Sequence, residues 1–278
     1  MTHLMRVSAQ AIGSVIDLRT PRTGQVHSVF THAVNLEMGA ELWTLTADGG
    51  HDAAFTVRLA GNVLPGDLGL RSRDPVHVRS RHVRAGAAVI DARTAARWTP
   101  HGYDVDLSGL SGRAAELTAA ARAVAWPGSW PLASAVVAAL AAGGRDDLDD
   151  AVRRAAGRGP GLTPSGDDVL VGVLAVLTMP GVTARCAPLV ARLRAALALA
   201  LPTTTEISRA LLSQASHGHV SRPVWELASA LLSCGAAASF TQARADVLST
   251  GATSGGDTCA GLAGACQLLS RPLEWICE

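Results

Sequence analysis

Two short segments of the sequence carry residue types that could do chemistry. Residues 165–168 read Ser-Gly-Asp-Asp, and residues 254–257 read Ser-Gly-Gly-Asp, at an offset of 89 residues (254 minus 165). In both segments a further glycine, Gly172 or Gly261, follows four residues after the last aspartate. The repeat predicts two glycine-rich turns, each of which opens one buried helix.

Such a turn is suited to binding an anion. The first N–H groups of a helix lack partners inside it, and the helix dipole places partial positive charge there. Glycine lets a ligand approach the backbone closely, and a serine hydroxyl can donate a hydrogen bond. The alternative interpretation is two helices that are simply capped by Ser and Asp, which are common capping residues.

The repeat also assigns candidate roles within an anion site. Asp168 and Asp257 take the same place in the two copies and are candidates for a general acid or base, or for holding Mg²⁺. Asp167 is a third catalytic candidate, and Gly256 stands in its place in the second copy, which indicates unequal roles. The candidates for substrate binding lie in or beside the turns and at the start of a later helix: Thr163, Ser165, Gly166, Ser254, Gly255, Gly256, Arg158 and Thr203.

The basic residues narrow the chemistry further. The sequence contains no lysine, so all 24 basic residues are arginines. This excludes a Schiff-base lysine, a pyridoxal phosphate anchor and a Walker lysine. A phosphate or carboxylate must therefore be held by backbone amides, hydroxyls or arginine. Arg158 lies next to the first turn and could clamp such an anion, although a solvated helix face explains it equally simply.

Composition sets the broad class. The chain has 278 residues, 48% of them hydrophobic, and a net charge of +1. A substantial core is expected, and no nucleic acid or membrane partner is indicated. The apolar runs are too short to span a bilayer, so we expect a soluble, cytoplasmic protein. The five cysteines have no C-x-x-C spacing and are expected to be buried thiols: Cys186, Cys234, Cys259, Cys266 and Cys277.

The hydrophobic pattern predicts an α+β protein with two domains. Residues 1–107 alternate apolar and polar positions between turns, which predicts an antiparallel β domain, and residues 108–278 have helical spacing, which predicts a larger all-helical domain that carries both glycine-rich turns. The expected strands are 5–18, 26–36, 41–45, 54–59, 76–78, 87–90 and 103–107. The expected helices are 111–125, 131–142, 146–156, 166–179, 184–200, 204–216, 222–234, 241–249 and 255–269.

Smaller motifs have simpler explanations. Thr203 and Glu206 have the spacing of a capping box at a helix start, and the threonines there could also join the anion site. His217 and His219 could bind a metal or could form a polar helix end. Phe30 is expected in the core. The roles of His27 and Asn35 stay open. A polar residue in an apolar strand is either turned to solvent or buried with partners, and the sequence does not distinguish the two cases.

The sequence resembles the AllH-like family, named for a subunit associated with catabolic oxamate carbamoyltransferase. The likeness rests on Gly-Pro-Gly-Leu-Thr-Pro-Ser-Gly-Asp-Asp at 159–168, Val-His-Ser-Val-Phe and Val-Asn-Leu within 26–36, the threonines from 203, and Thr-Ser-Gly-Gly-Asp at 253–257. It implies carbamoyl transfer between a small carboxylate amide and phosphate, and it supplies no established catalytic residues.

Three functions fit this resemblance and the residues. The first is a carbamoyltransferase, or a subunit of one, acting on small anions such as carbamoyl phosphate and oxamate. The second is a non-catalytic subunit that binds an anionic metabolite and supports a catalytic partner. The third is a lyase or cyclase that acts on a small carboxylate. Partner subunits or a homo-oligomer are compatible with each of them.

Overall fold

The computed structural model describes residues 4–233 and 237–271. The chain divides into two compact units, Met1–His101 and Gly102–Glu278. The first unit is built of strands and the second of helices, which confirms the α+β class. In the parts of the chain described, no helix is both long enough and apolar enough to cross a membrane.

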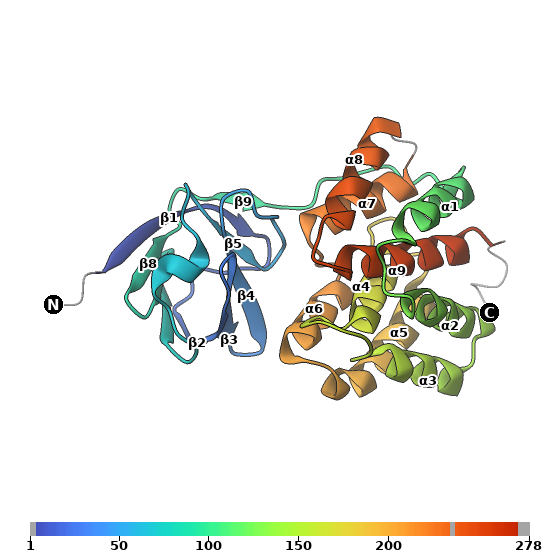
Figure 1. Cartoon of the computed structure of the whole chain (residues 1–278), viewed down its shortest axis with the longest axis horizontal. Helices are drawn as coiled ribbons and strands as arrows, with labels where there is room; N and C mark the ends of the chain where they lie inside the picture. The colour runs from blue at the N-terminus through green and yellow to red at the C-terminus, as the bar shows by residue number, and fades with distance from the viewer. Residues whose placement is uncertain (1–3, 234–236, 272–278) are drawn as a thin grey trace. The chain divides into compact units, whose positions relative to one another are not determined.

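The first unit is a β-barrel. Within the described residues eight strands pair in the order β5-β4-β3-β2-β6-β7-β8-β1, and β5 also pairs with β1, which closes the sheet; β9 lies along β1 (Figure 1). The strands are β1 (Met5–Gly13), β2 (Arg22–Val29), β3 (Ala33–Met38), β4 (Glu41–Thr46), β5 (Thr56–Leu59), β6 (Pro75–Arg79), β7 (His82–Ala85), β8 (Ala88–Asp91) and β9 (Ala96–Trp98).

Alternation of side chains explains how the barrel acquires its core. Along β6 the side chains of Val76 and Val78 point inward, while the residues on either side of each are exposed. Trp43 of β4 is fully buried among the inward-facing residues of the other strands. The period-2 pattern of the sequence thus places apolar side chains on the inside of the barrel.

Several expectations for the β domain were wrong. The sheet is mixed rather than antiparallel, because β1 pairs with β8 and β9, and β4 with β5, in parallel. The expected strand 26–36 is a hairpin of β2 and β3. Phe30 lies at its turn, where its N–H donates to the Ala33 carbonyl at 2.8 Å. Its side chain is 37% exposed and does not lie in the core. The short strands β7 and β9 were not foreseen.

The expected strand 103–107 is also absent from the described structure, where these residues form no regular element. Tyr103 instead packs edge-on against Trp225, with ring centroids 6.2 Å apart, and its hydroxyl donates to the Pro180 carbonyl at 2.8 Å. The alternating pattern here arises from packing on helices rather than from sheet pairing.

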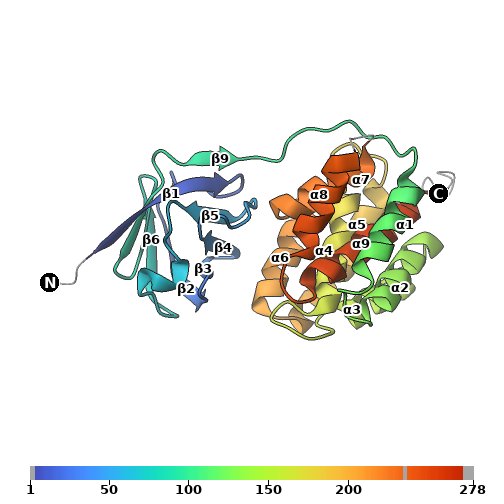
Figure 2. The same cartoon turned by 45° about the horizontal axis from the view of Figure 1, so that its top comes forward.

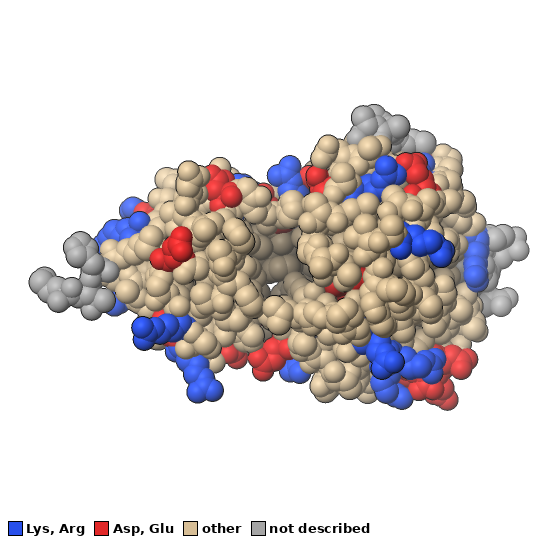
Figure 3. All heavy atoms as spheres, viewed as in Figure 1, with Lys and Arg blue, Asp and Glu red and all other residues tan. Residues whose placement is uncertain are grey.

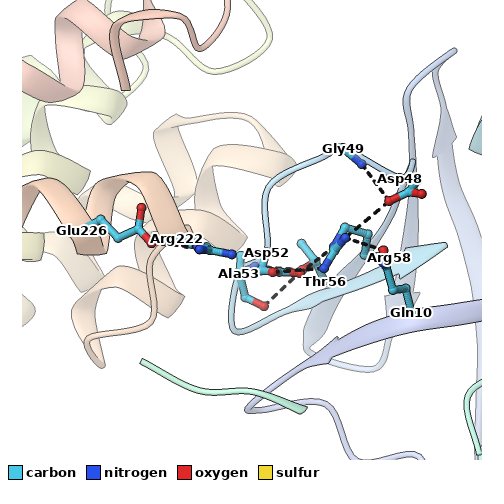
Figure 4. Close-up of polar contacts among 9 residues, drawn as sticks. All are labelled: Gln10, Asp48, Gly49, Asp52, Ala53, Thr56, Arg58, Arg222 and Glu226. Atoms are coloured by element: carbon cyan, nitrogen blue, oxygen red, sulfur yellow. Dashed lines mark hydrogen bonds and ion pairs between the residues drawn. The ribbon is translucent and has the colours of Figure 1, made fainter. Parts of the chain in front are cut away.

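Two buried polar side chains of the barrel, Asn35 and Asp52, have partners. Asn35 is buried, donates to the Ser28 hydroxyl at 3.0 Å and accepts from the Thr44 hydroxyl at 2.8 Å, so it is a buried residue with partners rather than one turned to solvent. Arg58 donates from Nε to Oδ1 of the buried Asp52 at 2.9 Å, as Figure 4 shows. A buried carboxylate in this unit therefore has a matching cation.

The second unit contains nine α-helices among its described residues, and each of the nine expected helices is found. They are α1 (Leu110–Ala121), α2 (Ser129–Ala142), α3 (Arg145–Ala155), α4 (Ser165–Leu177), α5 (Ala187–Ala200), α6 (Glu206–Ser216), α7 (Arg222–Leu232), α8 (Ala237–Leu248) and α9 (Ser254–Leu269). Residue 234, the expected end of the seventh helix, lies outside the described residues. On the face drawn in Figure 3, Arg side chains are interspersed with Asp and Glu.

Helices α4 and α9 form the centre of this unit. They pack on each other, and the remaining helices surround the pair (Figures 1 and 2). A Cβ on Gly172 would lie 2.1 Å from the Thr258 carbonyl oxygen, and one on Gly261 would lie 2.0 Å from that of Val169. The two glycines thus allow the backbones to touch directly.

Cys186, Cys259 and Cys266 are buried free thiols, as expected; Cys234 and Cys277 lie outside the described residues.

Candidate functional site

The turn before α4 is closed by its own backbone. Gly159 and Gly161 have φ angles of +104° and +100°, which side-chain-bearing residues rarely adopt. The Gly166 N–H donates to the Arg158 carbonyl at 2.7 Å, and the Asp167 N–H donates to that of Pro164 at 2.8 Å. The amides expected to face an anion here are therefore already bonded to carbonyls.

The turn before α9 behaves similarly. The Gly255 N–H donates to the Thr250 carbonyl at 3.0 Å. A Cβ on Gly255 would lie 2.0 Å from the Val247 carbonyl oxygen, and one on Gly166 would lie 2.0 Å from that of Ala155. Backbone packing against α3 and α8 is by itself a sufficient reason for glycine at these two positions.

Simple capping does not account for the two serines. The N-caps are Pro164 for α4 and Thr253 for α9, and neither makes a side-chain capping bond. Ser165 and Ser254 are instead the first residues of the helices. Their hydroxyls are therefore available for contacts across the junction of α4 and α9.

The two turns meet through three of the expected residues. Thr163 Oγ1 lies 3.2 Å from Ser254 Oγ and donates to Asp168 Oδ2 at 3.3 Å. Thr163 and Asp168 come from the first copy and Ser254 from the second, so residues 91 positions apart share one cluster. We call Thr163, Asp168 and Ser254 the junction cluster.

Asp168 is the acidic residue of the junction cluster, and its pKa is strongly shifted. Its side chain is 7% exposed, and burial raises its pKa to about 8. The nearby charges of Asp257 and Asp167 add to the rise, and hydrogen bonding by Ser254 and Thr163 opposes it. Asp168 therefore holds a proton near neutral pH and can donate it, which suits a general acid.

Asp257 occupies the equivalent place in α9 but has different partners. Its Oδ1 accepts from the Trp126 N–H at 2.8 Å and from the Ser129 hydroxyl at 2.7 Å. Its Oδ2 is buried and, within residues 4–233 and 237–271, has no hydrogen-bond partner; the same is true of Ser165 Oγ. Two buried polar atoms at the starts of α4 and α9 are thus left unmatched, which is costly unless a ligand or water satisfies them.

Asp167 holds the turn before α4 in place through hydrogen bonds. Its carboxylate accepts from the Gly157 N–H at 2.9 Å and from the Thr204 hydroxyl, and burial raises its pKa. Both oxygens are therefore bonded within the protein. Thr204 was not singled out from the sequence, where it stands between two other threonines and no spacing rule marks it.

The other predicted residues lie outside the junction cluster. Thr205, not Thr203, is the N-cap of α6 and accepts from the Ser208 N–H at 3.2 Å, so the capping box was misplaced. Thr203 lies in a short 3₁₀-helix, Leu201–Thr203, and its hydroxyl donates to the Ala200 carbonyl at 2.7 Å. Arg158 is exposed beside the first turn.

The histidines do not gather with other metal ligands. The rings of His217 and His219 stack at the end of α6, with centroids 6.5 Å apart. His27 Nδ1 lies 3.0 Å from Ser28 Oγ in the barrel. Across the described part of the chain, no three His, Cys, Asp or Glu side chains are close enough to hold a metal ion.

Two protein-family models match the chain. The family described as oxamate carbamoyltransferase subunit AllH matches residues 155–266, which include both turns and the junction cluster. The chain belongs to the AllH family. The AllH family N-terminal domain matches residues 5–97, which cover the barrel. No curated protein and no solved structure matched the chain.

Proposed function

We propose that this AllH-family chain is a subunit of a carbamoyltransferase and that small anionic substrates bind where the N-termini of α4 and α9 meet. The family description supports the reaction, because it names a subunit of oxamate carbamoyltransferase. The single observation that carries the location is Asp168, a buried carboxyl with a raised pKa that is shared by both turns.

A repeated helix pair supports the same location. The contacts of Gly172 with Thr258 and of Gly261 with Val169 exchange under the 89-residue offset of the two segments. We infer that α4 and α9 are related by an approximate two-fold axis that brings both helix N-termini to one place. Two dipole ends of the same sign would then favour an anion between them.

The anion would be held by groups that the protein does not already use. The N–H groups of Ser165 and Ser254 have no backbone acceptor among the described residues, and Ser165 Oγ is an unmatched donor. Protonated Asp168 adds a donor without adding negative charge. These groups replace the amides of Gly166, Asp167 and Gly255, which are bonded internally.

The chemistry requires a proton to move. The amide nitrogen of oxamate forms a bond to the carbamoyl carbon of carbamoyl phosphate, the bond from that carbon to a phosphate oxygen breaks, and one N–H proton ends on the released phosphate. Asp168 would protonate the leaving oxygen and would afterwards regain a proton that derives from the amide. A group with a pKa near the working pH is best able to do both.

The test measures oxamate-dependent release of phosphate from carbamoyl phosphate, with the chain alone and in complex with its co-purified partner subunits. Asp168→Asn should lower the rate by at least ~100-fold, the usual scale for loss of a general acid. Asp150→Asn, which changes an exposed carboxylate on α3, is the matched control and should keep full activity. Full turnover by Asp168→Asn would remove Asp168 from the chemistry.

The word "subunit" in the family description favours one other function, a non-catalytic role beside a catalytic partner. In that case the chain would bind phosphate or oxamate without turnover. Asp168→Asn would then weaken binding but leave the rate at saturating substrate unchanged in the complex, which separates the two proposals.

A further inference from the structure

Asp257 differs from the other buried aspartates in what its oxygens contact. Asp52 is paired with Arg58, and both oxygens of Asp167 are bonded to protein donors. Asp257 is fully buried and its Oδ1 is held by two donors, yet its Oδ2 has none in the described residues. A fixed carboxylate with one open acceptor atom is suited to receive a donor from a ligand.

We propose that Asp257 Oδ2 accepts an N–H of the substrate's carbamoyl or amide group. This inference rests on the proposed function and names the group of the substrate that the site recognises, an N–H donor. It makes Asp257 a specificity-determining residue that selects primary amides over groups of the same shape without N–H.

The open carboxylate oxygen of Asp257 is complementary to an amide in both polarity and charge. An amide presents N–H donors, which match a buried acceptor atom that has no partner among the described residues. A carboxylate ligand presents only acceptors and would place a like charge at Asp257. An acetyl group offers no donor and would leave Oδ2 unmatched. Sites with buried polar groups reject such analogues strongly, because the unpaired group keeps its desolvation cost.

Thr163 lies beside Asp168 in the junction cluster. Its hydroxyl contacts Ser254 at 3.2 Å and Asp168 at 3.3 Å, both at the long end for O–H···O hydrogen bonds. The segment that carries it follows Gly161, whose φ of +100° lies in the region that favours glycine. A small ligand bound at the junction would have to displace the Thr163 hydroxyl from these two contacts.

The experiment compares carbamoyl phosphate with acetyl phosphate, which differ only by NH₂ in place of CH₃, as ligands of the full chain in complex with its partner subunits. We expect the wild type to bind carbamoyl phosphate at least ~10-fold more tightly. Asp257→Asn keeps an Oδ1 for Trp126 and Ser129 but puts NH₂ at the Oδ2 position. In that variant the preference should fall to near one.

Two further results make the test decisive. In the wild type alone, oxamate should compete at least ~10-fold better than oxalate, a comparison that does not depend on whether the variant folds. Equal binding of each pair by the wild type, or an unchanged preference in folded Asp257→Asn, would overturn this inference and leave the proposed function standing. Binding of none of these compounds would overturn the proposed function and the inference with it.

Discussion

The starts of α4 and α9 have nearly the same residue types but different surroundings. At α4, Asp168 contacts a hydroxyl of its own turn and lies against Ser254 of the other. At α9, Asp257 is instead fixed by the backbone N–H of Trp126 and the hydroxyl of Ser129. Asp168 therefore carries a proton that it can donate, and Asp257 is a fixed hydrogen-bond acceptor. The repeat supplies two carboxyl groups, and their neighbours make them chemically unlike.

The residue before each of these aspartates explains part of the difference. Asp167 reaches back to Gly157 and across to Thr204, so it ties the first turn to the start of α6. In α9 the corresponding residue is Gly256, where a Cβ would lie 2.4 Å from the Ala125 nitrogen. A side chain is used as a brace at one helix and excluded at the other. The substitution that breaks the repeat is thus a consequence of packing.

The largest expected effect comes from blocking the contact that the two helices share. Gly261→Val would place its side chain on the Val169 carbonyl oxygen and force α4 and α9 apart. We expect a loss of at least ~3 kcal/mol in the free energy of unfolding, measured by urea denaturation, or failure to fold. Gly172→Val should behave alike.

Gly112→Ala is the control for this comparison. Gly112 lies in α1, and a Cβ there meets nothing within 4 Å. Its replacement should raise the free energy of unfolding by ~0.5–1 kcal/mol, because alanine is the better helix former. If Gly261→Val were as stable as Gly112→Ala, the close backbone contact at the centre of the unit would not exist.

A second effect is expected from the proton on Asp168. Its pKa rises from 3.8 to about 8 on folding, so the folded protein binds one more proton than the unfolded chain between these pH values. The free energy of unfolding should therefore fall as pH rises from 4 to 8 and level off above 8. At ~1.4 kcal/mol per pH unit, this group would lower the free energy of unfolding by roughly 3–4 kcal/mol between pH 5 and pH 8.

Asp168→Asn isolates this contribution, because the difference between the two proteins cancels other titrating groups. Relative to the wild type, the variant should be more stable at pH 8 than at pH 5, as measured by urea unfolding at both values. A difference that does not change with pH would mean that Asp168 is ionised throughout this range, and it could not then act as a proton donor.

The sequence predicted more of the helical unit than of the barrel, for physical reasons. The helices are marked by local spacing, and Ser165 and Ser254 lie within one residue of the predicted helix starts. The barrel depends on pairing between distant strands, such as β1 with β5, that no local pattern encodes. In the site, the repeat indicated Asp168 and Asp257, but Trp126 and Ser129 come from a distant segment and could not be foreseen.

A third prediction concerns the hydrogen bond between Thr204 and Asp167. Thr204→Val removes the hydroxyl that bonds Asp167 and leaves a buried carboxylate oxygen short of a donor. We expect a loss of ~1–2 kcal/mol in the free energy of unfolding. Thr203→Val is the neighbouring control, since that exposed residue bonds only within its own turn, and it should cost less than ~0.5 kcal/mol. Equal losses would mean that Asp167 is no more tied to α6 than a surface residue is.

The smallest effect is expected at Arg158, and it separates two ways of holding an anion. Arg158 is exposed beside the α4 turn, and its carbonyl, which accepts from the Gly166 N–H, is kept by any substitution. If hydroxyls, Asp168 and the first amides of the helices supply the binding, Arg158→Ala should change the affinity for phosphate, measured by calorimetry, by less than ~3-fold. Loss of a direct charge-assisted bond would instead cost ~1.5–3 kcal/mol, roughly 10-fold or more. A loss of that size would place the anion on the arginine at the edge of the turn and not between the two helices.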